Sequence, residues 1–345
     1  MEQIQAVKEI LSFPKDIVLT SHRNPDGDAL GSTLGLMQYL KQLGHNVQVI
    51  YPSDYPNIYN WMPGVEDAVI YDLDPEKATA LIKSAQVIFI LDYNSLDRVD
   101  KMGEMISYAK CPKIMIDHHL DPEPCADFIF SDTTSSSTSE MVYDFITALG
   151  DRHRIIPLVG ENLYVGIVTD TGSFKFSTSP KVFRVVADLV DLGVNDVKLQ
   201  DLIFNCQYEK HLRLLGHCLY NRMEILPEFN TGIIWLTKKD YESFDIQRGD
   251  TEGIVNYLLT LKNIRMAAFI TEQPNIVKIS LRSKGDFSVQ EVCRDHFRGG
   301  GHKNASGGFS HGNLNSVLIK FKNLLPLYKD KLVSTDNELH IQNLN

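Results

Sequence analysis

The chain has 345 residues, of which 43% are hydrophobic, so it exceeds the usual size of one domain and can bury two cores. Its 34 basic and 44 acidic side chains give a formal net charge of −10. Because affinity for a long nucleic acid grows with the number of phosphates that basic residues neutralise, this charge argues against long duplex nucleic acid as a partner and favours a short anionic ligand.

The cysteine pattern, the apolar runs and the N-terminus indicate where in the cell the protein is expected. The five cysteines are scattered and include no CxxC pair, so we expect neither a disulfide framework nor a zinc–thiolate site. No apolar run approaches the roughly 20 residues that span a membrane. The N-terminus lacks the charged and apolar regions of a signal peptide. We therefore expect a cytoplasmic protein with no membrane partner.

Strand-like and helical patterns alternate along the first part of the chain. Short β-branched and apolar runs predict strands over 17–21, 46–51, 87–91 and 113–116, with an edge strand over 126–130. Alternation of this kind indicates parallel strands joined by crossover helices. The N-terminal part is therefore predicted to be an α/β domain built on a parallel sheet.

Three helices are predicted after the last of these strands. Residues 137–140, Ser-Thr-Ser-Glu, form a capping-box pattern that opens a helix running to 150. A second helix is predicted over 157–168, with Asp170 just beyond it. A third, over 206–222, is predicted to connect two domains and has leucines that repeat at three and four positions, namely Leu212, Leu215 and Leu219.

The second domain is predicted to start near Pro227 and to be a smaller mixed α/β unit. Its patterns predict strands over 231–236, 264–270 and 276–283, and helices over 252–262 and 288–297. The expected division of the chain is thus an N-terminal domain over 1–205, a connecting helix over 206–226, a C-terminal domain over 227–330 and a polar tail over 331–345.

Histidines and aspartates gather where the predicted strands end. They are His22, Asp26 and Asp28 after the first strand, Asp92 after the third, Asp117, His118 and His119 after the fourth, and the later Asp170. Open α/β sheets bind ligands at the carboxyl ends of their strands. Carboxylates with imidazoles and no thiolate suit Mn²⁺ or Mg²⁺, and a pair of such ions roughly 3.5–4 Å apart supplies the nucleophile and the charge that phosphoester hydrolysis requires.

The order of these motifs resembles the DHH phosphoesterase superfamily. The motifs are HxxxDxD at 22–28, an Asp that ends a hydrophobic strand, DHH at 117–119 and Asp-Thr-Gly at 170–172. Residues 299–302, Gly-Gly-Gly-His, resemble the DHH-associated domain found in many members. The resemblance extends from about 17 to about 309, is strongest to the nanoRNase and 3′-phosphoadenosine 5′-phosphate phosphatase subgroup, and implies an active site in the cleft between the two domains.

The resemblance also implies a role for each residue. One metal ion would be bound by His22, Asp26 and Asp92, and the other by Asp28, Asp92, His118 and Asp170. His119 would donate a hydrogen bond to the substrate phosphate, and Asp117 would orient a ligating imidazole. Arg98 would contact phosphate, or else pair with an acidic neighbour.

The segment 282–303 carries five basic and three acidic residues, in contrast to the acidic chain as a whole. It is interpreted either as a basic pocket for a short anion or as a solvated helix face. Glycines without a Cβ let backbone N–H groups approach an anion, although a flexible hairpin turn would show the same sequence. The resemblance implies that the substrate is bound by Arg282, Gly299, Gly300, Gly301, His302 and Lys303.

The implied enzyme is a phosphoesterase in which a hydroxide bridging two Mn²⁺ ions is the nucleophile, with Mg²⁺ or Co²⁺ as alternatives. Its expected substrates are short oligoribonucleotides, cleaved to mononucleotides, and/or 3′-phosphoadenosine 5′-phosphate, converted to AMP. The alternative is a linear or cyclic dinucleotide phosphodiesterase. Exopolyphosphatase, inorganic pyrophosphatase and a non-catalytic nucleotide-binding regulator are less favoured, the last because every ligand position is retained. The sequence leaves a homodimer open.

Overall fold

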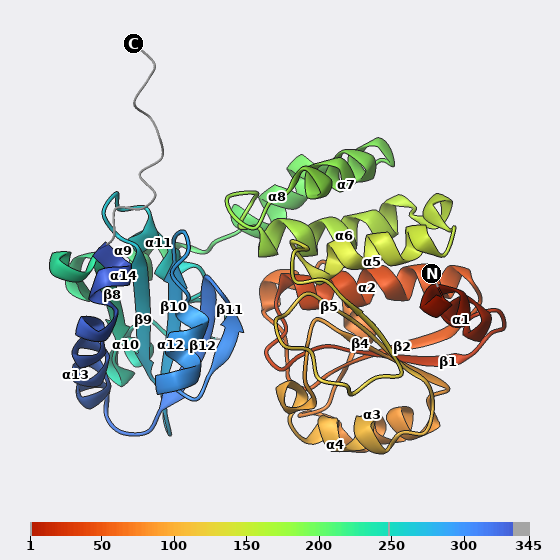
Figure 1. Cartoon of the computed structure of the whole chain (residues 1–345), viewed down its shortest axis with the longest axis horizontal. Coiled ribbons are helices and arrows are strands. Elements are labelled where there is room, and N and C mark those ends of the chain that lie inside the picture. Colours follow the sequence, from red (N-terminus) through yellow and green to blue (C-terminus); the bar gives the residue numbers. More distant parts are fainter. Residues whose placement is uncertain (1, 248, 334–345) are drawn as a thin grey trace, which may run out of the picture. The chain divides into compact units, whose positions relative to one another are not determined.

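The computed structural model describes residues 2–247 and 249–333. The chain divides into two compact units, Met1–Cys206 and Gln207–Asn345, and each unit has its own sheet covered by helices (Figure 1). The predicted fold class, an N-terminal domain with a parallel sheet followed by a smaller mixed α/β domain, is confirmed.

The first unit contains a sheet of six parallel strands in the order β3-β2-β1-β4-β5-β6. Their bounds are β1 Asp16–Thr20, β2 Asn46–Tyr51, β3 Val69–Ile70, β4 Val87–Leu91, β5 Lys113–Asp117 and β6 Phe128–Ser131. The five predicted strands are all present. The edge strand β3 was not predicted, because two residues are too short to show a pattern.

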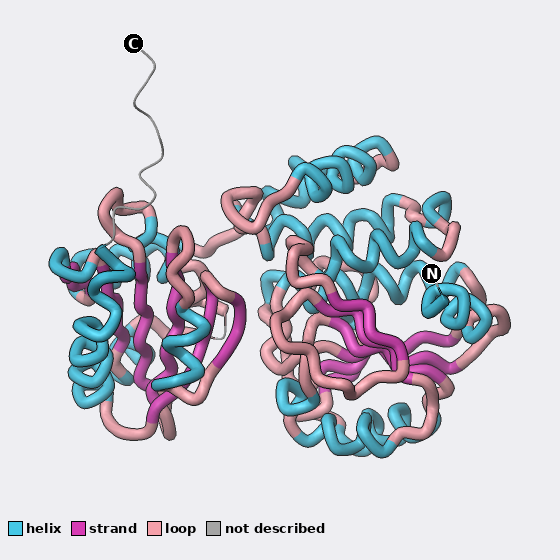
Figure 2. Tube along the Cα trace, in the orientation of Figure 1, coloured by secondary structure: helices cyan, strands magenta, loops and turns pink. Residues whose placement is uncertain are grey.

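Helices cover both faces of this sheet, which explains why its strands are continuous apolar runs rather than alternating ones. Phe89 packs into one core cluster, whereas the next residue, Ile90, packs into the cluster on the opposite face. The helices lie in two layers with the sheet between them (Figure 2). The first layer contains α2 (Gly27–Gln42), α5 (Thr138–Ala148) and α6 (Pro157–Asp170), and the second contains α3 (Pro75–Ser84) and α4 (Lys101–Tyr108).

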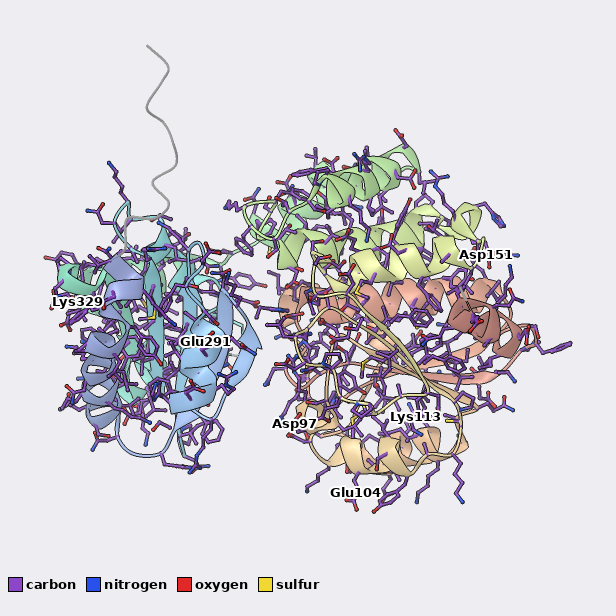
Figure 3. All side chains as sticks on the ribbon, in the orientation of Figure 1. Asp97, Glu104, Lys113, Asp151, Glu291 and Lys329 are labelled. Atoms are coloured by element: carbon purple, nitrogen blue, oxygen red, sulfur yellow. The ribbon has the colours of Figure 1, made fainter. Side chains whose placement is uncertain are left out.

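The remaining helices of the first unit are α1 (Glu2–Ile10), α7 (Pro180–Asp191) and α8 (Asp196–Phe204), of which α7 and α8 pack on α6. Short 3₁₀ turns include Leu96–Val99, directly before α4. Charged side chains such as Asp97 and Glu104 are exposed on this unit, as Lys329 is on the other (Figure 3).

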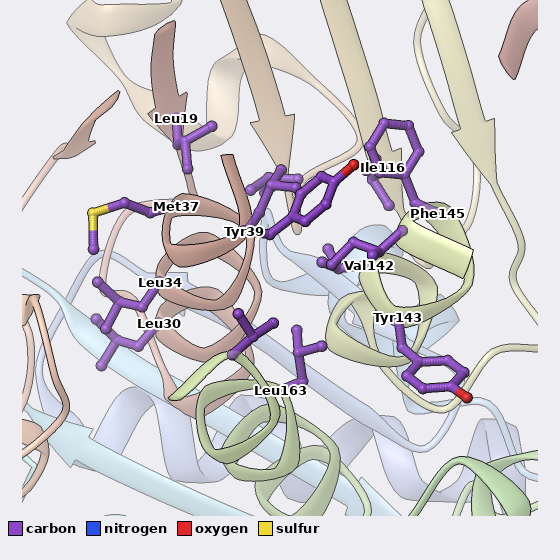
Figure 4. Packing of buried hydrophobic residues seen from close by; sticks show 14 of the residues in the cluster. Leu19, Leu30, Leu34, Met37, Tyr39, Ile116, Val142, Tyr143, Phe145 and Leu163 are labelled. Carbon is purple, nitrogen blue, oxygen red and sulfur yellow. The ribbon is translucent and has the colours of Figure 1, made fainter. Parts of the chain in front are cut away.

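Helix α2 lies at the centre of the larger core cluster. Leu30, Leu34 and Met37 point from one side of it, and Tyr39 points from another side, near Val142 of α5 (Figure 4). All these side chains are almost completely buried. Because α2 is buried on nearly every side, the chain that leads into it from β1 has a fixed position.

Helices α2 and α6 approach each other closely because glycines line their contact. A Cβ atom at Gly27 would lie 2.3 Å from Oγ1 of Thr169 on α6, and one at Gly166 would lie 2.6 Å from Oδ1 of Asp28 on α2. Distances this short leave no room for a methyl group. The contact brings the last turn of α6, which ends at Asp170, beside the first turn of α2.

The second unit contains a mixed sheet in the order β11-β12-β10-β9-β8-β7. Among the strands described for this unit, β8 and β9 pair in parallel and the other pairs are antiparallel. The strand bounds are β7 Met223–Leu226, β8 Thr231–Leu236, β9 Met266–Glu272, β10 Val277–Ser283, β11 Gly300–His302 and β12 Ala305–Ser310. The helices are α9 (Glu209–Asn221), α10 (Lys238–Ser243), α11 (Ile254–Leu259), α12 (Val289–His296), α13 (Leu314–Leu324) and α14 (Lys329–Val333).

The predicted connecting helix needs correction. Helix α9 packs on β7 and β8 and belongs to the second unit, so 206–226 is not a separate connection. The repeating leucines do not mark the buried face of this helix, because Leu212 is 59% exposed whereas Leu214 and Cys218 are buried. Burial is set here by the sheet that α9 covers, which the local sequence pattern does not contain.

Two further differences concern unpredicted elements of the second unit and the predicted tail. Strands β7, β11 and β12 and helices α10, α13 and α14 were not predicted. Residues 331–333 of the predicted tail belong to α14, and 334–345 lie outside the described residues. Within 2–247 and 249–333, no helix is both long enough and apolar enough to cross a membrane.

Candidate metal centre

The predicted ligands are brought together by the strand ends of the first unit. His22 follows β1, Asp92 follows β4, and His118 follows β5, so the order of these parallel neighbours places their ends at one edge of the sheet. Asp26 is the N-cap of α2, and its carboxylate accepts hydrogen bonds from the N–H groups of residues 28 and 29. Asp170 is the last residue of α6, a helix end rather than a strand end.

One group of candidate ligands contains His22, Asp26 and Asp92. Nε2 of His22 lies 3.3 Å from Oδ2 of Asp92 and 3.9 Å from Oδ1 of Asp26. Nδ1 of the same ring lies 2.9 Å from the carbonyl oxygen of Arg23. This contact fixes the ring so that Nε2 faces the carboxylates.

A second group surrounds His118. Its Nε2 lies 3.3 Å from Oδ2 of Asp170, 3.6 Å from Oδ1 of Asp92 and 3.8 Å from Oδ2 of Asp28. Asp92 thus presents one oxygen to each group. It has a positive φ of 64°, a conformation that is uncommon for residues other than glycine and that occurs mostly where the surrounding structure enforces it.

Asp117 orients His119, whereas we expected it to orient one of the ligating imidazoles, His22 or His118. Oδ1 of Asp117 lies 2.7 Å from Nδ1 of His119, and Oδ2 accepts a hydrogen bond from the backbone N–H of His119. The ring of His118 is oriented instead by the carbonyl oxygen of Ser135, 3.3 Å from Nδ1. Asp117 ends β5, so its side chain folds back onto the residue two positions later. Asp92, Asp117 and His119 also form a compact group of ligating atoms.

The start of α5 contributes contacts that the sequence did not predict. The backbone N–H groups of Thr138 and Ser139 donate to the two carboxylate oxygens of Asp28, at 2.6 and 2.8 Å. The hydroxyl of Thr138 donates to Oδ1 of Asp92 at 3.0 Å. The capping-box pattern located this helix start correctly, because Ser137 accepts from the N–H of Glu140. It contained no information about the segment's neighbours in space.

The cluster holds more buried negative charge than its own cations balance. Burial, reinforced by Asp28 and Asp26, raises the pKa of Asp92 well above its usual value. Burial also raises the pKa of Asp170, to about 8. Burial opposes the charge on His118, but Asp170, Asp92 and Asp28 outweigh it and raise the pKa of His118 to about 9. These groups retain protons because too little positive charge lies near them. Divalent cations, which bind carboxylate oxygens and imidazole nitrogens, would supply that charge.

His119 is in the opposite electrostatic situation. Burial, together with the positive charges of Arg98, His118 and His22, holds the pKa of His119 well below its usual value. A neutral ring that donates from Nδ1 to Asp117 has a lone pair on Nε2. Donation from Nε2 to a phosphate, the role implied by the family resemblance, therefore requires the protonated ring, which an arriving phosphate would favour.

Arg98 lies near this cluster. Together with burial, its positive charge lowers the pKa of both His22 and His119. Its carbonyl oxygen accepts a hydrogen bond from the N–H of Arg23 at 2.8 Å. Of the two interpretations left open, pairing with an acidic neighbour finds no support in the described part of the chain, where no carboxylate lies within 4.0 Å of its guanidinium nitrogens.

The glycine segment of the second unit is a strand, not a flexible loop. Gly300, Gly301 and His302 form β11, which pairs with β12. A Cβ at Gly299 would lie 1.9 Å from the carbonyl oxygen of Gly307, so this glycine is required by packing. Gly301 is required as well, because its φ is 138°. Among the three glycines at 299–301, a Cβ would meet no atom within 4 Å only at Gly300.

The basic residues around β11 are less available than their number suggests. Nζ of Lys303 lies 3.0 Å from Oδ1 of Asp286, and Arg294 pairs with Asp295. Arg282 lies on β10 and donates to the carbonyl oxygen of the preceding residue. The charged face is therefore partly neutralised within the unit.

Comparisons with known proteins match these features. Residues 16–167 match the model of the DHH family, N-terminal domain, and residues 233–326 match that of the DHHA1 domain. The chain is 30% identical over 304 residues to the bifunctional oligoribonuclease and PAP phosphatase NrnA of Bacillus subtilis, covering 86% of this chain and 90% of that protein. It is 26% identical to the cyclic-di-AMP phosphodiesterase GdpP of Geobacillus thermodenitrificans, covering 86% of this chain but 45% of that one.

Solved structures show the same fold. An exopolyphosphatase-related protein from Bacteroides fragilis superimposes with a TM-score of 0.92 and 37% identity, covering 96% of this chain and 98% of that one. The exonuclease RecJ bound to manganese shares the fold, with a TM-score of 0.52 and 15% identity over 98% of this chain and 96% of that one. The chain therefore belongs to the DHH family of phosphoesterases and carries a C-terminal DHHA1 domain.

Proposed function

We propose that this phosphoesterase hydrolyses short oligoribonucleotides to mononucleotides and removes the 3′-phosphate of 3′-phosphoadenosine 5′-phosphate. The observation that carries the proposal is the position of Asp92, whose two oxygens face two separate groups of histidine and carboxylate ligands. The similarity to the NrnA protein of Bacillus subtilis supports the choice of substrates, because that relative bears the name of both activities.

The donor set fits two divalent cations. His22, Asp26 and Asp92 would hold one ion, and the other would be held by Asp28, Asp92, His118 and Asp170. Mn²⁺ is the ion in one related RecJ structure and Mg²⁺ in another, and both accept this mixture of oxygen and nitrogen ligands. Such ions, when bound, place positive charge on phosphate oxygens and lower the pKa of water.

Other residues of the chain would bind and orient the substrate. Asp117 holds the ring of His119 at 2.7 Å, so a protonated His119 would meet the phosphate in one fixed orientation. Arg98 would add a positive charge next to the same group, because no carboxylate of the described residues neutralises it. Arg282, Gly300 and His302 of the second unit would bind the distal part of the nucleotide.

A second candidate function is the hydrolysis of linear or cyclic dinucleotides. It is favoured by the similarity to the GdpP protein, although this chain spans less than half of that relative. Both functions use the same metal centre, so they differ only in the substrate that the second unit accepts. The acidic chain argues against a processive nuclease acting on long strands.

The test is a substrate panel. Mn²⁺-loaded protein is incubated with labelled RNA from two to about twenty nucleotides, 3′-phosphoadenosine 5′-phosphate, cyclic dinucleotides and pyrophosphate. We expect kcat/KM to be highest for RNA of two to five nucleotides and to fall by about an order of magnitude or more for the longest RNA, because net charge opposes its binding. Preferential hydrolysis of pyrophosphate, or equal rates on all RNA lengths, would refute the proposal.

A further inference from the structure

Glu140 is a completely buried carboxylate in the first turn of α5. Its Oε2 accepts three hydrogen bonds, from the backbone N–H of Ser136 at 2.8 Å, the hydroxyl of Ser136 at 2.6 Å and the hydroxyl of Ser135 at 3.1 Å. Its Oε1 lies 3.4 Å from Nζ of Lys181. Burying a carboxylate is costly unless donors compensate it, so this position is occupied by glutamate for a reason other than helix formation.

Helix capping does not supply that reason. The hydroxyl of Ser137 already accepts from the N–H of Glu140 and caps the helix. In a full capping box the glutamate side chain would bind the N–H of the N-cap residue, here Ser137. Glu140 instead binds the residue before it, Ser136, and thereby fixes the loop that leads into the helix.

The segment fixed by Glu140 contacts three candidate metal ligands. The carbonyl oxygen of Ser135 faces Nδ1 of His118. Three residues later, the backbone and hydroxyl of Thr138 donate to Asp28 and Asp92 respectively. Residues 135–139 therefore connect Glu140 to ligands of both proposed ions through direct hydrogen bonds.

We propose that Glu140 is a positioning residue for the metal centre. It holds residues 135–139 in the one conformation that turns Nε2 of His118 toward Asp92 and orients both oxygens of Asp28. Without its charge, the buried N–H of Ser136 would lose a strong acceptor, and the loop would relax away from these ligands. This inference rests on the proposed function only in requiring that the cluster binds divalent cations.

The test measures Mn²⁺ binding, without turnover, by titration followed by electron paramagnetic resonance. Glu140→Gln keeps the size of the side chain but replaces the carboxylate by a neutral amide. Residues that orient metal ligands typically contribute about 10- to 100-fold to metal affinity, so we expect the Mn²⁺ dissociation constant to rise by about tenfold, while circular dichroism shows an unchanged fold.

Asp144→Asn is the matched control. Asp144 lies one turn further along α5 and pairs with the same Lys181 at 2.5 Å, but its hydrogen bonds and ion pairs in the described structure do not include residues 135–137. Removing its charge should leave the Mn²⁺ dissociation constant within about twofold of the wild-type value, because nothing that holds the ligands changes.

Two further outcomes are distinguishable. If Glu140→Gln does not fold, Ser136→Ala removes only one of the three donors to Oε2 and should weaken Mn²⁺ binding by a few-fold. If a folded Glu140→Gln or Ser136→Ala variant binds Mn²⁺ as tightly as the wild type, the positioning role is wrong. Absence of Mn²⁺ binding by the wild type would instead refute the metal centre itself.

Discussion

Replacing Gly166 by alanine should weaken metal binding in a protein that still folds. The new Cβ would lie 1.9 Å from Oγ of Ser139 and 2.6 Å from Oδ1 of Asp28. Cβ atoms are essentially never found within 3.0 Å of another heavy atom, so the two sides must separate by 3.0 − 1.9 = 1.1 Å unless the Ser139 side chain rotates. Rotation of Ser139 would still leave the contact with Asp28.

The displacement acts on the metal centre because Asp170 lies one turn after Gly166 on the same face of α6. A shift of about 1 Å is about a third of the 3.3 Å between Oδ2 of Asp170 and Nε2 of His118, and misplacements of this size can lower activity by about 100-fold. Overpacking costs about 1–3 kcal/mol, but exchanging a helical glycine for alanine returns up to about 1 kcal/mol. The net loss of stability should be about 0–2 kcal/mol.

Gly160→Ala provides the control on the same helix. Its Cβ would lie 2.7 Å from a methyl group of Val194, far along α6 from the metal ligands. Urea unfolding with EDTA should show similar small losses of stability for both variants, whereas the Mn²⁺ dissociation constant should rise by at least about tenfold only for Gly166→Ala. Equal Mn²⁺ affinity in the two variants would refute the idea that this contact sets the position of Asp170.

Other changes separate the roles of individual side chains. Asp92→Ala should abolish turnover at saturating Mn²⁺ in a folded protein, whereas Asp97→Ala, at an exposed site, should keep it within a few-fold; comparable activity in both would contradict a shared ligand. Arg282→Ala should lower kcat/KM on a dinucleotide by about 10- to 100-fold while sparing a small generic phosphodiester; equal losses would make Arg282 structural. Asp240 is buried, which opposes its ionisation, but Arg222 and Thr237 outweigh burial and hold the pKa of Asp240 well below its usual value. The resulting stability is present above the ordinary aspartate pKa of about 4 and is lost as the pH falls further, so Asp240→Asn should lower stability at pH 7 and flatten its acid dependence in thermal unfolding.

The parts of the fold that could be predicted are those in which a short stretch of sequence shows a clear pattern, such as a continuous apolar run. The run of residues 87–91 is apolar on every position because helices cover both faces of the sheet, and it ends at the aspartate that both ligand groups share. The clusters at 22–28 and 117–119 were predictable for the same reason, because each directly follows a buried apolar strand of the same sheet. Asp170 was grouped with the other aspartates from the sequence, although the structure places it at the end of helix α6 and not at the end of a strand.

The parts that escaped prediction depend on contacts between distant segments. Thr138 and Ser139 bind Asp28 across more than a hundred residues, and no local pattern encodes such a pairing. Glycines are disfavoured in strands, so the segment 299–302 suggested a loop; its strand arises because Gly299 can lie against the backbone of Gly307. The exposed Leu212 shows the same limit, since leucine spacing does not reveal which side a sheet will cover.

The parallel sheet of the first unit has a consequence for how the metal centre can form. No two neighbouring strands are joined by a hairpin, and the ligands extend from His22 to Asp170 along the chain. Loop-closure entropy must be overcome for every one of these pairings before the ligands meet. A partly folded chain therefore cannot hold the ions, so divalent cations should stabilise only the completed unit, by mass action, and should slow its unfolding without accelerating its folding.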